Sequence, residues 1–164
     1  MVVSLLATLS FAALAGGAVA LDRRVRARED EAVRDYPPEG EIVLVGARRV
    51  HAVVRGSGPD LVMIHGASGN TRDFTFGFAA RMAADFRVIA VDRPGLGYTD
   101  RVDDGHGARF AAGAESPAEQ AGLLMQAARL LGADRPLVLG HSYGGAVALA
   151  WALDHPVAGV ITLG

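Results

Sequence analysis

The sequence contains no cysteine and no lysine among its 164 residues. The absence of cysteine excludes a disulfide framework, zinc–thiolate sites and a cysteine nucleophile. All 16 basic residues are arginine, and with the acidic residues they leave a formal net charge of −2. A charge so nearly balanced argues against a nucleic-acid partner. The hydrophobic content of 51% is enough for one modest domain, which we place at residues 40–164.

Charged side chains are also absent from residues 2–21, which form an apolar run. As a helix rising about 1.5 Å per residue, this run would cross a bilayer core of about 30 Å. Arg23 and Arg24 follow it, and the positive-inside rule then predicts a single-pass membrane anchor with the domain in the cytoplasm. The alternative is a signal peptide cleaved after Ala18-Val19-Ala20, with export of the domain. Residues 22–39 are expected to form a charged juxtamembrane helix or linker.

Short β-like runs alternate with helical stretches from residue 41 onward. The expected strands are 41–45, 50–55, 61–64, 87–91, 137–139 and 160–163. The expected helices are 71–85, broken near Gly77, then 116–131, and a third from Ser142 to about His155. Ser116-Pro117-Ala118-Glu119 is a capping box that predicts the start of the second helix. Such alternation predicts an α/β fold, a mostly parallel sheet of about six strands flanked by helices.

The segment Gly140-His141-Ser142-Tyr143-Gly144 follows one expected strand and precedes a helix. A serine at such a strand-to-helix turn is typical of a nucleophile elbow. Side chains two residues before or after the serine would clash in so sharp a turn, so Gly140 and Gly144 suit these positions. The plain alternative is a glycine-rich turn that packs a helix on a strand. With both flanking elements predicted, we interpret Ser142 as a nucleophile.

Two further loops follow expected strands. In acyl transfer, two donors stabilise the developing oxyanion. We assign these donors to the backbone N–H groups of Ala67, in the loop that starts with His65-Gly66, and of Tyr143. Asp92 begins the other loop, where it is expected to hold the loop or pair with Arg93 rather than act as a triad acid, since such an acid must orient a histidine from beyond it.

These three motifs, in this order and at this spacing, resemble the N-terminal half of the α/β-hydrolase superfamily. His65-Gly66 is similar to its oxyanion loop, the segment from Asp92 to Gly97 to its D-R-P-G-x-G loop, and the segment from Gly140 to Gly144 to its elbow. The resemblance implies an eight-stranded sheet, a lid after strand six, and a Ser–Asp/Glu–His triad in that chain order. It also implies that the acid and the histidine lie beyond Gly164. We therefore expect this chain alone to be inactive, because an unassisted serine is a weak nucleophile.

None of the five histidines present is expected to replace the missing base; they are His51, His65, His106, His141 and His155. In this superfamily, dehalogenases and epoxide hydrolases carry aspartate at the elbow. Ser142 therefore implies hydrolysis of an ester-type acyl bond in a small molecule, without a metal or cofactor. Two alternatives stay open: a non-catalytic, membrane-tethered binding protein of the same fold, and cofactor-free perhydrolase chemistry. The sequence makes no prediction of the substrate or the oligomeric state.

Overall fold

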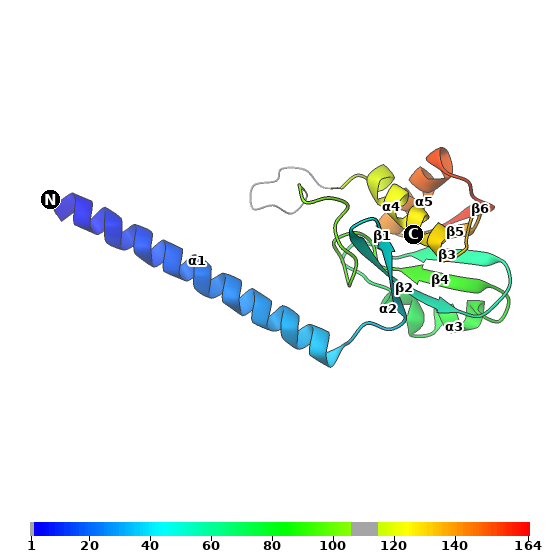
Figure 1. Cartoon of the computed structure of the whole chain (residues 1–164), viewed down its shortest axis with the longest axis horizontal. Helices are drawn as coiled ribbons and strands as arrows, with labels where there is room; N and C mark the ends of the chain where they lie inside the picture. The colour runs from blue at the N-terminus through cyan, green and yellow to red at the C-terminus, as the bar shows by residue number, and fades with distance from the viewer. Residues whose placement is uncertain (1, 106–114) are drawn as a thin grey trace. The chain divides into compact units, whose positions relative to one another are not determined.

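The computed structural model describes residues 2–105 and 115–164. It divides the chain into two compact units, one that ends at Pro38 and one that spans Glu39–Gly164 (Figure 1). His106, one of the five histidines named above, lies outside the described residues.

The first unit is dominated by one continuous helix, α1, which runs from Val2 to Asp35. The expected apolar anchor and the expected charged linker thus belong to the same helix. From Asp22 onward most positions are acidic or basic, and Arg26 pairs with Asp22 one turn earlier at 2.9 Å. Within the part of the chain that the structure describes, no helix is both long enough and apolar enough to cross a membrane. The predictions of a transmembrane helix at residues 2–21 and of a single-pass membrane location are therefore wrong.

The second unit is built on a mixed sheet that contains six strands within the described residues, in the order β1-β2-β4-β3-β5-β6. The strands are β1 (Glu41–Val45), β2 (Arg48–Arg55), β3 (Asp60–Ile64), β4 (Arg87–Val91), β5 (Leu137–His141) and β6 (Gly159–Leu163). β1 and β2 form an antiparallel hairpin, and β2 also pairs antiparallel with β4. The pairs β3–β4, β3–β5 and β5–β6 are parallel. The carboxyl ends of four strands therefore meet at one edge of the sheet.

The central strands β3 and β4 are buried on both faces, because their alternate residues contribute to different cores. In β3, Val62 and Ile64 pack with residues of α4 (Pro117–Leu130) and α5 (Tyr143–Asp154). Leu61 and Met63 point the other way, into a core with residues of α2 (Arg72–Thr75) and α3 (Phe78–Met82). Figure 1 shows α4 and α5 on one side of the sheet and α2 and α3 on the other.

Local sequence signals fix several boundaries of these elements. Gly77 separates α2 from α3, as expected. The predicted capping box starts α4: the Ser116 hydroxyl accepts from the Glu119 amide at 3.2 Å, while the Glu119 carboxylate accepts from the Ser116 amide at 2.7 Å. β2 begins two residues earlier than expected and β5 ends two residues later, at His141. β5 therefore delivers the chain directly to Ser142.

Candidate active site

Ser142 lies at a sharp turn between β5 and α5. Its backbone has φ 51° and ψ −120°, in a region that L-residues rarely adopt. Its amide donates to the Leu163 carbonyl at 2.7 Å, which ties the turn to the end of β6. The side chain is exposed, and no hydrogen bond of the described residues involves its hydroxyl. The sharp turn therefore presents a free hydroxyl at the carboxyl edge of the sheet.

Two glycines make this turn possible. A Cβ added to Gly140 would collide with the backbone of Gly144 and Gly145, and one added to Gly144 would collide with the carbonyl groups at the end of β3. Gly145 differs, since its added Cβ would meet only Thr162 Cγ2 at an ordinary 3.5 Å. The sharp turn at Ser142 therefore leaves no room for a side chain two residues before or after the serine.

The expected oxyanion loop lies beside this turn. Ile64 of β3 pairs with Gly140 of β5, so the loops that follow these two strands start at the same level. A Cβ added to Gly66 would lie 3.1 Å from Ser142 Cβ, which shows how closely the loops approach. Among the described residues, no acceptor takes the backbone N–H of Ala67 or of Tyr143. Tyr143 is also the first residue of α5, where the helix dipole favours negative charge.

Arg93 and His65 hold the oxyanion loop in place. The Arg93 amide donates to His65 Nε2 at 2.9 Å, and His65 Nδ1 lies 2.9 Å from the Gly66 carbonyl oxygen. Since Nε2 accepts, His65 must be neutral with its proton on Nδ1. Burial lowers the pKa of His65, in agreement with that form. His65 therefore serves the loop through hydrogen bonds, and its ring nitrogens are both occupied away from Ser142.

Asp92 is the centre of a buried network that the sequence did not predict. It does not pair with Arg93: its carboxylate lies 2.7 Å from His51 Nδ1 and accepts from the Thr71 amide at 2.7 Å and the Tyr98 amide at 3.0 Å. The other ring nitrogen of His51 contacts the Glu39 carbonyl oxygen. Both partners of His51 are acceptors, an arrangement that favours the ring form with two protons and a positive charge.

Electrostatics agree with this charged pair. Burial by itself lowers the pKa of His51, but the hydrogen bonds to Asp92 and Glu39 outweigh it, and the net shift is upward. For Asp92, burial by itself raises the pKa, and the hydrogen bonds from His51, Tyr98 and Thr71 turn the net shift downward. The pair fixes the loop after β4 against β2 and the start of α2. Asp92 therefore ties the loop after β4 to β2 and to the start of α2 through these contacts.

The remaining described histidines do not form a base for Ser142. His141 is exposed at the end of β5, and His155 ends α5 with its amide bonded to the Trp151 carbonyl at 2.8 Å. Neither ring hydrogen-bonds to the serine hydroxyl.

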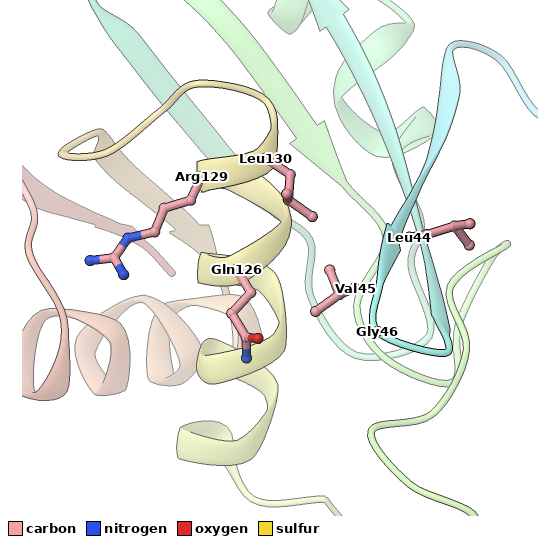
Figure 2. A pocket seen from close by; sticks show the side chains of 6 residues that line it. All are labelled: Leu44, Val45, Gly46, Gln126, Arg129 and Leu130. Atoms are coloured by element: carbon pink, nitrogen blue, oxygen red, sulfur yellow. The ribbon is translucent and has the colours of Figure 1, made fainter.

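A separate hollow of about 420 Å³ lies between the β1–β2 hairpin and α4. In Figure 2, Val45 and Leu130 reach into this space, while Arg129 extends away from it. The hollow is lined by Leu44, Val45, Gly46, Gln126, Arg129 and Leu130. None of these residues belongs to the three loops around Ser142, so we do not assign the hollow to the candidate active site.

Comparison with known proteins places the chain in a family. Residues 61–164 match the alpha/beta hydrolase family. An uncharacterized protein of Mycobacterium tuberculosis is 32% identical over 132 residues, which cover 80% of this chain and 36% of that protein. The proline iminopeptidase of Saccharolobus solfataricus is 34% identical over 102 residues, 62% of this chain and 31% of that protein.

Among solved structures, a putative epoxide hydrolase from Pseudomonas aeruginosa superposes with a TM-score of 0.66 and 29% identity, over 77% of this chain and 41% of that one. The protein belongs to the alpha/beta hydrolase family. The chain spans about a third of the length of these curated relatives.

Proposed function

We propose that the protein is a serine hydrolase that cleaves an ester-type acyl bond in a small molecule. The observation that carries this proposal is the geometry of Ser142: an exposed hydroxyl on a strained turn, next to two backbone N–H groups that have no acceptor among the described residues. Strain of this kind costs about 1–3 kcal/mol and persists where a site needs it. A turn with a purely structural role could relieve the strain by carrying glycine in place of Ser142.

The proposed reaction uses these groups in a fixed order. The Ser142 hydroxyl loses its proton to a general base as its oxygen attacks the carbonyl carbon of the substrate. The carbonyl electron pair moves onto oxygen, and the N–H groups of Ala67 and Tyr143 donate to that oxyanion. The leaving alcohol departs with a proton, and water then hydrolyses the acyl-enzyme. In this proposal the base and its acid come from outside the 164 residues, since the matched segments cover only 36% and 31% of these two relatives.

The identity of the nucleophile favours acyl transfer within the family. As noted for this superfamily, epoxide hydrolases and dehalogenases carry aspartate at the elbow, whereas this chain has Ser142 at that position. A serine nucleophile also requires hydrogen-bond donors for the developing oxyanion, and the N–H groups of Ala67 and Tyr143 can provide them. One relative is named a proline iminopeptidase, and peptide-bond cleavage is also an acyl transfer, which supports the proposal.

A fluorophosphonate probe tests the proposal, since it reacts covalently with activated serine nucleophiles. We expect the full-length protein to gain one adduct, which peptide mapping places on Ser142. Ser142→Ala should gain none. Ser57→Ala is the matched control, because Ser57 is exposed in the β2–β3 turn, away from the carboxyl edge of the sheet, and it should label like the wild type. A folded wild-type protein that does not react, or that reacts at another residue, would contradict the proposal.

A further inference from the structure

Arg93 carries a buried charge that has no acidic partner within residues 2–105 and 115–164. Its exposed fraction is 6%. Burial lowers its pKa, but an arginine side chain stays protonated in proteins. Glu115 is the carboxylate that favours this charge, yet Glu115 forms its ion pair with Arg101 at 3.6 Å. Burying a charge without a counter-ion costs free energy. The hydrogen-bond partners of Arg93 therefore indicate its role.

The Arg93 guanidinium binds the peptide group that carries the first proposed oxyanion donor. Arg93 Nη1 donates to the Gly66 carbonyl oxygen at 2.8 Å, and His65 Nδ1 is a second donor to the same oxygen. The Gly66 carbonyl and the Ala67 N–H belong to one planar peptide unit and point in opposite directions. Two donors that hold the carbonyl on one side therefore aim the Ala67 N–H to the other side. Hydrogen bonds to the carbonyl also polarise the N–H.

The same side chain contacts the second proposed donor residue. The guanidinium carbon lies 4.3 Å from the centre of the Tyr143 ring, within the range of a cation–π contact. Its Nε donates to Gln120 at 3.0 Å, and Gln120 in turn donates to the Glu115 carbonyl at 2.9 Å. Arg93 is thus held by Gln120 of α4, and it contacts Gly66 of the oxyanion loop and Tyr143 of the elbow.

We propose that Arg93 is a positioning residue that orients the Ala67 N–H toward the oxyanion and places a positive charge behind it. This inference rests on the proposed serine hydrolase function. Arg93 does not touch the reacting atoms and acts through the Gly66–Ala67 peptide group and the Tyr143 ring.

The test is the rate constant at which fluorophosphonate labels Ser142 in the full-length protein, measured per folded molecule and well below the melting temperature. We expect Arg93→Gln to label about 10- to 100-fold more slowly, because loss or misplacement of one oxyanion donor costs that much or more. Arg93→Met, which removes the buried charge entirely, carries the same prediction if the glutamine variant does not fold. Arg93→Lys keeps the charge but loses the planar fork, so its rate should lie between those of Arg93→Gln and the wild type.

Arg87→Gln is the matched control. Arg87 lies at the other end of β4 and holds Asp60 at 2.6 Å and the Leu131 carbonyl at 2.7 Å, so its loss affects stability without reaching the elbow. Its labelling rate per folded molecule should equal that of the wild type. The inference is overturned if Arg93→Gln or Arg93→Met labels at the wild-type rate, if Arg93→Lys is no faster than Arg93→Gln, or if Arg87→Gln is slowed as much as Arg93→Gln. A wild-type protein that never labels at Ser142 contradicts the proposed function itself, which separates the two failures.

Discussion

Replacing Ser142 with glycine should make the protein more stable while it removes the nucleophile. The reason is the backbone of Ser142, which has φ 51° and ψ −120°. Glycine adopts positive φ without the steric cost that a Cβ brings. The serine hydroxyl makes no hydrogen bond within the described chain, so its loss removes no stabilising contact there.

The expected magnitude follows from two opposing effects. Relief of backbone strain at Ser142 contributes about 1–3 kcal/mol. The greater freedom of glycine in the unfolded chain offsets about 0.4–1 kcal/mol of this gain. The net expectation is an increase of about 1–2 kcal/mol in the free energy of unfolding. At about 2–4 °C per kcal/mol for a domain of 150–250 residues, that corresponds to a rise of about 2–8 °C in melting temperature.

The assay is differential scanning calorimetry of the full-length protein, with Ser142→Ala as the control. Alanine also removes the hydroxyl but keeps a Cβ, so it should retain the strain and melt close to the wild type. Both variants should fail to react with fluorophosphonate. If Ser142→Gly melts at the same temperature as Ser142→Ala, or lower, then the turn stores no strain and the reasoning from its backbone angles is wrong.

Three further predictions concern the packing around the site. Gly140→Ala and Gly144→Ala should each destabilise the protein by more than about 2 kcal/mol in urea unfolding, because the new Cβ meets backbone, whereas the matched Gly145→Ala should cost less than about 1 kcal/mol. Asp92→Asn leaves the His51 imidazolium buried without its counter-ion and should cost about 3–5 kcal/mol in the same assay. The melting temperature should also depend on pH. Because the pKa of His51 is raised on folding, His51 stabilises the protein fully below its unfolded pKa of about 6.5, and this stability is lost as the pH rises through the folded pKa. Because the pKa of Asp92 is lowered on folding, Asp92 stabilises the protein above its unfolded pKa of about 3.9, and this stability is lost as the pH falls through the folded pKa. We therefore expect the melting temperature to be highest between about pH 4 and 6.5 and to fall on both sides of that range. A melting temperature that does not fall on either side would contradict the charged pair.

Local signals in the sequence were sufficient for much of the fold. The capping box at Ser116 and the break at Gly77 each depend on residues within a few positions, and the structure has both. The turn at Ser142 could be predicted for the same reason, because its two glycines are set by local sterics. The apolar run before Asp22 was misleading, since its helix continues without a break into charged residues.

The contacts that fix the loops could not be predicted in this way. Asp92 pairs with His51, 41 positions earlier, rather than with its neighbour Arg93. Arg93 reaches back to Gly66 and forward to Gln120, across 27 positions in each direction. Asp92 meets His51, and Arg93 meets Gly66, because β2, β4 and β3 are adjacent in the sheet, whereas Gln120 comes from α4. Neither strand order nor helix packing is encoded in local patterns. The one available signal was an arginine two residues after the end of the buried strand β4.

In the proposed site, the Ala67 and Tyr143 amides face an oxygen bound to Ser142. The most direct measurement is the amide proton spectrum of isotope-labelled full-length protein before and after reaction with fluorophosphonate. The adduct places a phosphoryl oxygen where the oxyanion would lie, so the amide protons of Ala67 and Tyr143 should move downfield more than those of other residues. A protein that carries the adduct on Ser142 but shows no downfield shift at either amide would contradict the account.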